Sequence, residues 1–144
     1  MGPAANVTKA ERILVVDDEP GMRELLLAFF RKNGYQTVAA PDAVEGFDLV
    51  AEIDPTVVII DYRIAGGGGI NLIAKIREHF PAVRCLFMTA FDSPDYFERA
   101  ATAGAHDTLQ KPFDLLDLLA KVERQIKLYH KAALDRAPRR LHRV

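Results

Sequence analysis

Short apolar runs alternate along this chain with longer segments of helical periodicity. The three strongest runs contain four consecutive apolar residues each, at 13–16, 57–60 and 85–88. An uninterrupted apolar run is typical of a strand buried on both faces, as in a parallel sheet covered by helices. Weaker segments at 35–39 and 107–110 supply two more strands. The alternation therefore predicts an α/β fold.

Each segment between the runs carries one apolar helical stripe. In the first, apolar residues recur at the i, i+3, i+4 and i+7 spacing from Met22 to Phe30, and Asn33-Gly34 supplies the stop. Asp42 is expected to cap the second helix. The expected helices cover residues 22–30, 43–52, 72–80, 93–103 and 115–126.

Five strands and five helices in strict alternation imply right-handed crossovers and a parallel sheet with helices on both faces. For a chain of this length we expect a flavodoxin-like, doubly wound sheet with the strand order 2-1-3-4-5, because an eight-stranded barrel would need about twice as many residues. We interpret residues 1–10 as a flexible leader, 11–130 as the folded domain and 131–144 as a basic C-terminal extension or the start of a linker.

Composition narrows the class of protein. A single Cys among 144 residues excludes an internal disulfide and is typical of a cytoplasmic protein. No apolar run reaches the roughly 18 residues of a membrane span, so no membrane partner is expected. The net charge of −1 is a cancellation, because residues 1–130 hold 14 Lys and Arg against 19 Asp and Glu, whereas residues 131–144 hold 5 against 1. This basic tail is too short for a DNA-reading domain, so we expect no direct nucleic-acid binding.

Acidic residues stand at the ends of two strands that the predicted order places side by side. Asp17 and Asp18 follow the first strand, and Asp61 follows the third. Three carboxylates so close together repel one another and need a cation, and an all-oxygen site suits Mg²⁺. The pair alone has a structural alternative, with Asp18 as a helix N-cap. Asp61 favours the metal site, because a second strand delivers it to the same place.

Two more strand ends add a hydroxyl and an ammonium group, from Thr89 and Lys111. Each is unremarkable by itself, since strand-end threonines and solvated lysines are common. Together with the acids they predict a site in which one carboxylate attacks a phosphorus atom and forms an aspartyl phosphate. The metal, the lysine and the hydroxyl would offset charge on the transferred oxygens.

Five segments of the sequence are similar to the receiver domain of two-component response regulators: residues 13–20, 61–64, 68–70, 88–90 and 111–113. The resemblance spans about residues 11–130. It implies that the domain takes a phosphoryl group from a sensor histidine kinase or a phosphotransfer protein. It also implies that the domain is a signalling switch rather than an enzyme, and that it catalyses only its own phosphorylation and dephosphorylation.

The resemblance also assigns roles to individual residues. Asp61 would be the phospho-acceptor, and Lys111 and Thr89 would hold the phosphoryl oxygens. Asp18, Asp61 and the backbone carbonyl of Arg63 would bind Mg²⁺ directly, and Asp17 would act through a metal-bound water. The peptide bond between Lys111 and Pro112 is usually cis in the family.

Two departures from the family pattern concern the switch and a loop. Thr108 stands where the family has an aromatic switch residue, three positions before the lysine, so Thr89 and Thr108 are the switch candidates here. Residues 66–69 are four consecutive glycines, for which we predict a mobile loop. By resemblance, the fourth helix, fifth strand and fifth helix would engage a downstream protein or output domain, and the last two helices could form a homodimer.

Two other functions use the same fold. A Mg²⁺-dependent phosphohydrolase could work through an aspartyl phosphate, but enzymes that resemble the haloacid dehalogenase class carry a second Asp two residues after the nucleophile, where this chain has Arg63. A phosphorylation-independent docking or dimerisation module is the other alternative, and Thr108 and the loop glycines favour it.

Overall fold

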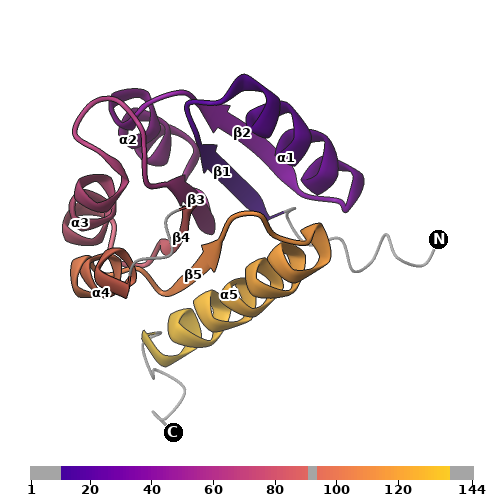
Figure 1. The fold of residues 1–144 in the computed structure, drawn as a ribbon. Coiled ribbons are helices and arrows are strands. Elements are labelled where there is room, and N and C mark those ends of the chain that lie inside the picture. Colours follow the sequence, from indigo (N-terminus) through magenta and orange to yellow (C-terminus); the bar gives the residue numbers. More distant parts are fainter. Residues whose placement is uncertain (1–10, 91–93, 137–144) are drawn as a thin grey trace, which may run out of the picture.

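A parallel sheet with the strand order β2-β1-β3-β4-β5 forms the centre of the computed structural model, which describes residues 11–90 and 94–136 (Figure 1). The strands are β1 (Arg12–Val16), β2 (Gln36–Ala40), β3 (Val57–Asp61), β4 (Arg84–Thr89) and β5 (Asp107–Gln110). The predicted fold and strand order are confirmed, and β2 begins one residue later than expected.

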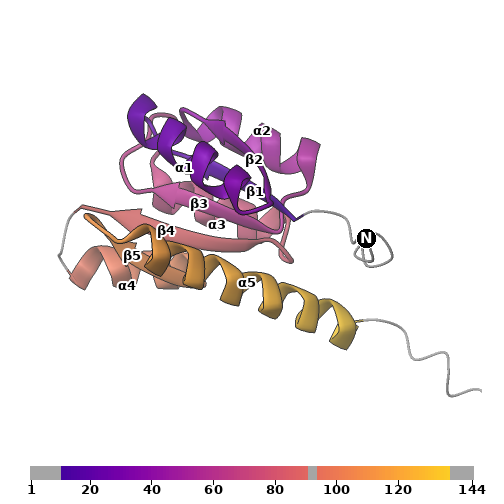
Figure 2. The same ribbon diagram turned by 90° about the vertical axis from the view of Figure 1, so that its right-hand side faces the viewer.

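Helices cover both faces of this sheet. They are α1 (Pro20–Lys32), α2 (Ala43–Ile53), α3 (Gly69–His79), α4 (Pro94–Ala103) and α5 (Leu115–Arg136). Helices α1 and α5 pack on one face and α2, α3 and α4 on the other (Figures 1 and 2). Residue 93, where the fourth helix was expected to begin, lies outside the described residues.

The last helix is longer than the apolar pattern predicts. It continues to Arg136, beyond the expected boundary of the domain at residue 130. Figure 2 shows its distal end reaching past the amino ends of the strands. The predicted leader at 1–10 and the end of the predicted extension at 137–144 lie outside the described residues.

The first strand shows why its sequence is continuously apolar. Leu14 and Val16 lie in the core under α2, α3 and α4, whereas Ile13 and Val15 lie in the core under α1 and α5. All four side chains are fully buried. A strand at the centre of a doubly wound sheet has two apolar faces, and burial of both supplies the main stabilisation of the fold.

The helix ends follow local chemistry. The Asp42 side chain accepts a hydrogen bond from the backbone N–H of Glu45 at 2.9 Å, which confirms it as the cap of α2. Asn33 is the C-cap of α1, and Gly34 after it has a φ of +93°, a conformation that favours glycine.

Within the described ranges, we find no helix that is both apolar and long enough to cross a membrane.

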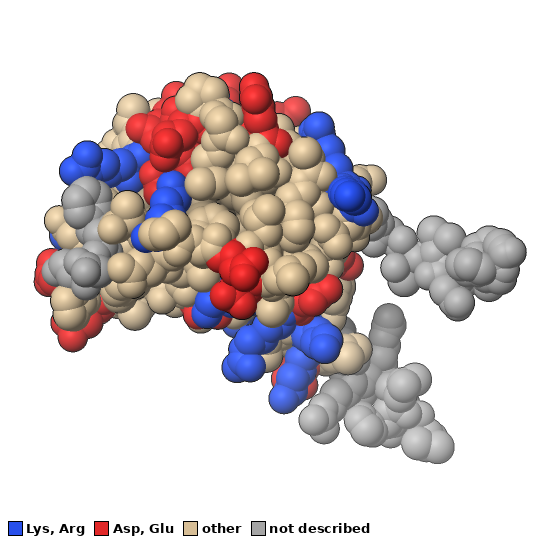
Figure 3. Space-filling view, turned by 45° about the vertical axis from the view of Figure 1, so that its right-hand side comes forward, with Lys and Arg blue, Asp and Glu red and all other residues tan. Residues whose placement is uncertain are grey.

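Lys and Arg side chains gather over the distal half of α5 (Figure 3). The exposed residues Arg124, Lys127 and Lys131 follow the i, i+3, i+7 spacing of one helix face there. Part of the positive charge predicted for the tail therefore belongs to this helix.

Candidate functional site

The site is built from four strand ends at the carboxyl edge of the sheet. Asp61 and Thr89 are the last residues of β3 and β4, and Asp17 and Lys111 directly follow β1 and β5. Parallel strands bring these ends to one edge, where the strand order reverses between β1 and β3. Asp61, Thr89 and Lys111 border a hollow of about 290 Å³, which is also lined by Asp18, Glu19, Arg63 and Ala90. Acidic and basic side chains meet at this edge, on the left in Figure 3.

Three carboxylates converge at this edge of the sheet. One oxygen from each of Asp17, Asp18 and Asp61 lies within 4.8 Å of the other two. Asp17 and Asp61 are buried, whereas Asp18 is exposed. Closely spaced carboxylate oxygens with one side open to solvent form a donor set that could bind a metal ion, and hard divalent cations suit such a set. The predicted convergence of the three acids is confirmed.

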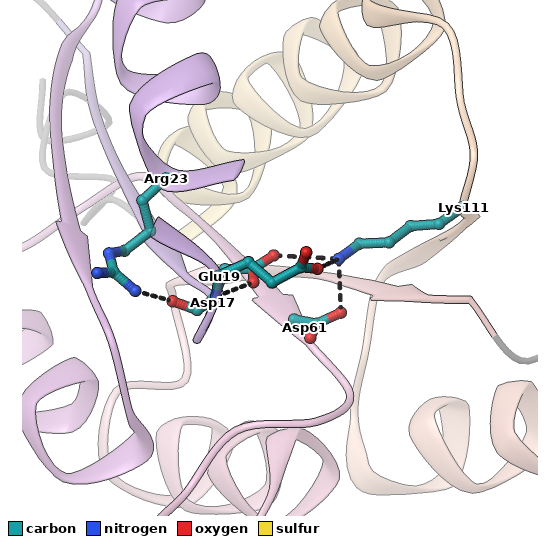
Figure 4. Close-up of polar contacts among 5 residues, drawn as sticks. All are labelled: Asp17, Glu19, Arg23, Asp61 and Lys111. Atoms are coloured by element: carbon teal, nitrogen blue, oxygen red, sulfur yellow. Dashed lines mark hydrogen bonds and ion pairs between the residues drawn. The ribbon is translucent and has the colours of Figure 1, made fainter. Parts of the chain in front are cut away.

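Lys111, which follows the edge strand β5, contacts the acidic cluster. Lys111 Nζ lies 3.1 Å from both Asp17 Oδ2 and Asp61 Oδ1, and 3.6 Å from Glu19 Oε1 (Figure 4). The Lys111–Pro112 peptide bond is cis, as the resemblance implies. One ammonium group therefore balances part of the charge of three acids.

Burial and charge shift the pKa values of both partners in this contact. Burial and the negative charge of Asp17 raise the pKa of Asp61 from 3.8 to about 6, although Lys111 opposes the shift. Burial acts to lower the pKa of Lys111, but the charges of Asp61 and Asp17 outweigh it and the pKa ends above its ordinary value. Asp61 is thus a carboxylate with excess negative charge around it, which a cation would relieve.

The turn from β1 to α1 is held by Asp17. Its Oδ1 accepts a hydrogen bond from the backbone N–H of Glu19 at 2.9 Å, and its carbonyl oxygen accepts one from Arg23 Nη1 at 2.7 Å. The interpretation of Asp18 as an N-cap is wrong. Glu19 occupies the N-cap of α1 and makes no side-chain cap bond, and Asp17 is the acid whose carboxylate turns back to the backbone.

The glycine run approaches Asp61 from the other side. A Cβ atom on Gly69 would lie 2.2 Å from the carbonyl oxygen of Asp61, so only glycine fits there. The backbone N–H of Gly69 donates to the Tyr62 carbonyl at 3.0 Å. Residues 66–68 have φ values of +88°, +112° and +88°. The loop thus depends on glycine both for its conformation and for its contact with Asp61, and its mobility stays a prediction.

The two switch candidates lie in different places. Thr89 is fully buried and borders the hollow. Thr108 lies in β5 opposite Phe87 of β4 and does not border the hollow. The structure therefore brings Thr89, but not Thr108, to the acidic cluster.

Tyr62 connects the site to α4. It directly follows Asp61, and its ring centroid lies 4.5 Å from that of Tyr96 in α4 and 6.1 Å from that of Phe87. A hydrogen bond with the Tyr62 hydroxyl is the main cause of a raised pKa at Tyr96. The residue next to Asp61 is thus in contact with a helix on the surface.

Sequence reasoning missed two residues of the site, Glu19 and Arg23. Glu19 directly follows the acid pair in the sequence, and its carboxylate contacts Lys111. Its place beside the acid pair was a usable signal. Nothing in the sequence indicates that Arg23, the fourth residue of α1, reaches back to the Asp17 carbonyl (Figure 4).

Fold and site together define a class: a doubly wound α/β domain with three acids, a hydroxyl and a lysine at the carboxyl ends of its strands. The sequence matches the response regulator receiver domain over residues 13–123, and the chain belongs to this family. The predicted resemblance is therefore confirmed.

Known proteins of the family cover this chain to different extents. The chain is 33% identical over 118 residues to sporulation initiation phosphotransferase F of Bacillus subtilis (strain 168). The aligned region covers 82% of this chain and 95% of the relative. It is also 33% identical over 138 residues to regulatory protein AtoC of Escherichia coli (strain K12), covering 96% of this chain but only 29% of AtoC. A CheY-like receiver domain protein from Methanospirillum hungatei JF-1 shares the fold, with a TM-score of 0.83 and 23% identity over 86% of this chain and 99% of the other.

Proposed function

We propose that this receiver domain is the phospho-acceptor of a two-component phosphorelay and that Asp61 takes the phosphoryl group from a sensor histidine kinase or a phosphotransfer protein. One observation carries the proposal: Lys111 Nζ lies 3.1 Å from Asp61 Oδ1 at the edge of an open hollow. A nucleophilic carboxylate and a cation thus border the space that phosphoryl oxygens would occupy.

The three-acid cluster supports Mg²⁺ as the cofactor. Asp18, Asp61 and the backbone carbonyl of Arg63 would hold the ion, with Asp17 acting through a bound water. The donor set consists of oxygen atoms, which Mg²⁺ prefers, and Arg63 borders the same hollow. When bound, the ion supplies positive charge that offsets the charge of the acids and of the phosphoryl oxygens.

Each residue of the site would have a separate role in the phosphoryl transfer. A carboxylate oxygen of Asp61 attacks the phosphorus, an O–P bond forms, and the P–N bond to the donor histidine breaks as the imidazole leaves. The positive charge of Lys111 favours the ionised carboxylate that attacks. Lys111 and Thr89 then hold the phosphoryl oxygens, and attack by water returns inorganic phosphate and free Asp61.

Phosphorylation would switch a protein-interaction face formed by α4, β5 and α5. Thr89 lies between the hollow and the start of the segment that leads to α4, which supports its role as a switch residue. Thr108 lies within the proposed face, on β5. The partner would be a downstream protein or an output domain, since a relative such as AtoC is much longer than this chain. Homodimerisation through this face and a cytoplasmic location belong to the same proposal.

The test is phosphorylation in vitro with Mg²⁺ and a small acyl phosphate. Intact mass and released phosphate are followed together for the wild type, Asp61→Asn and the control Asp48→Asn, which changes an exposed acid on α2. We expect one phosphoryl group per chain in the wild type and the control, none in Asp61→Asn, and slow release of phosphate.

Other outcomes would favour the alternatives. Rapid release of phosphate over many turnovers would indicate a phosphohydrolase. Absence of any adduct, even with a cognate kinase as the donor, would indicate a docking or dimerisation module.

A further inference from the structure

We propose that Arg23 is a positioning residue for the cation site. Its guanidinium fixes the peptide unit between Asp17 and Asp18 and so directs the Asp18 carboxylate toward Asp61. The inference deepens the proposed function, and it rests only on cation binding by the acid cluster, not on phosphorylation.

The backbone of Asp17 is held from both sides. Its N–H donates to the Ala40 carbonyl at 3.1 Å, and its carbonyl oxygen accepts from Arg23 Nη1 at 2.7 Å. Its carboxylate is held as well, by the Glu19 N–H and by Lys111. Asp17 is therefore fixed at four atoms, and Arg23 supplies the contact that points into α1 (Figure 4).

The carbonyl of Asp17 and the N–H of Asp18 belong to one planar peptide unit. The orientation of that unit sets the direction in which the Asp18 side chain leaves the backbone. Asp18 is exposed, so packing contributes little to its direction, yet its oxygen has to lie within 4.8 Å of those of Asp17 and Asp61. The hydrogen bond from Arg23 is the contact by which α1 holds this peptide unit.

The start of α1 makes such a contact important. Its N-cap has no side-chain hydrogen bond, and no acidic residue stands in its first turn. Side-chain caps ordinarily fix the turn before a helix. Here the Asp17 carboxylate holds the Glu19 N–H, and the Arg23 side chain reaches back from the helix to hold the Asp17 carbonyl.

Charge alone predicts the opposite effect on metal affinity. The guanidinium is always positive and lies beside the acid cluster, so its removal would lessen repulsion of a divalent cation and strengthen binding. Positioning predicts that removal weakens binding, because Asp18 is no longer directed to the site. The sign of the change therefore separates the two effects.

The test compares Arg23→Met with the matched variant Arg31→Met. Arg31 also lies on α1 and donates to a backbone carbonyl, that of Thr37, at 2.8 Å, but it does not border the hollow. The dissociation constant for Mg²⁺ is measured by calorimetry without a phosphodonor, and the free energy of unfolding by urea titration.

We expect Arg23→Met to bind Mg²⁺ about tenfold more weakly than the wild type, the usual effect of losing a residue that orients a metal ligand. Arg31→Met should lose stability but keep the wild-type affinity for Mg²⁺. Arg23→Lys keeps the positive charge but not the planar guanidinium, and its affinity for Mg²⁺ should lie between those of the wild type and Arg23→Met.

Unchanged or tighter Mg²⁺ binding in Arg23→Met would overturn the inference, as would an equal loss in Arg31→Met. A wild type that binds no Mg²⁺ would overturn it together with the proposed cofactor. A wild type that binds Mg²⁺ and depends on Arg23, but is never phosphorylated, would overturn the proposed function and support this inference.

Discussion

Replacement of Asp61 by Asn should stabilise the Mg²⁺-free protein near neutral pH. The Asp61 side chain is only 8% exposed and lies beside another buried acid, Asp17, so its ionised form is disfavoured in the folded chain. Asn has almost the same size and no charge. It also keeps an oxygen that can accept a hydrogen bond from Lys111.

The size of the effect follows from the pKa of Asp61. This pKa rises from 3.8 to about 6 on folding, so stability falls as the pH increases through that interval. The change corresponds to roughly 3 kcal/mol of unfolding free energy above pH 6. Solvent in the hollow screens part of it, so we expect Asp61→Asn to gain about 2 kcal/mol at about pH 7.5. At about pH 4.5 the gain should be about a third as large.

Urea unfolding in EDTA at these two pH values measures the difference. Asp48→Asn on α2 is the control and should leave the stability nearly unchanged, because Asp48 is exposed. Mg²⁺ should stabilise the wild type more than Asp61→Asn. An Asp61→Asn variant no more stable than the wild type at about pH 7.5, or a gain in stability that does not depend on pH, would show that burial of the Asp61 charge does not destabilise the fold.

Three further predictions concern the loop, the tyrosine contact and the core. Gly69→Ala should cost about 1–3 kcal/mol of stability and weaken Mg²⁺ binding, because its Cβ would meet the Asp61 carbonyl. The control Gly21→Ala, at a position with open space around it, should cost no stability. Equal losses of stability in urea titrations of the two variants would contradict the prediction for Gly69. Tyr62→Phe should lower the pKa of Tyr96 toward 10.0, because the hydrogen bond that raises it is lost; an unchanged NMR titration would argue against that contact. Leu118→Ala should cost about 2–5 kcal/mol in urea unfolding, because Leu118 is fully buried under the sheet, and a loss below 1 kcal/mol would show that α5 packs loosely there.

Much of the fold follows from the sequence because burial in a doubly wound sheet leaves a strong pattern. The run 13–16 is apolar at every position, since its side chains enter two cores in turn. The length of α5 was less predictable. Its apolar stripe ends near Ile126, but His130 contacts Glu11 at 3.1 Å, and good helix formers such as Ala133 and Leu134 continue the helix.

The site was predictable where topology alone decides proximity. Asp17, Asp61 and Lys111 meet because each stands at a strand end, and strand ends are visible in the sequence. Arg23 was not predictable, because its contact depends on how a long side chain of α1 folds back over the preceding turn. Likewise, the need for glycine at position 69 depends on the path of the loop past the Asp61 carbonyl.

Peptide mass mapping of the protein after incubation with an acyl phosphate shows whether Asp61 accepts a phosphoryl group in a Mg²⁺-dependent reaction. We expect one phosphoryl group per chain, located on the peptide that contains Asp61 and absent when EDTA replaces Mg²⁺. A phosphoryl group on any other peptide, or equal labelling with and without Mg²⁺, would contradict this expectation.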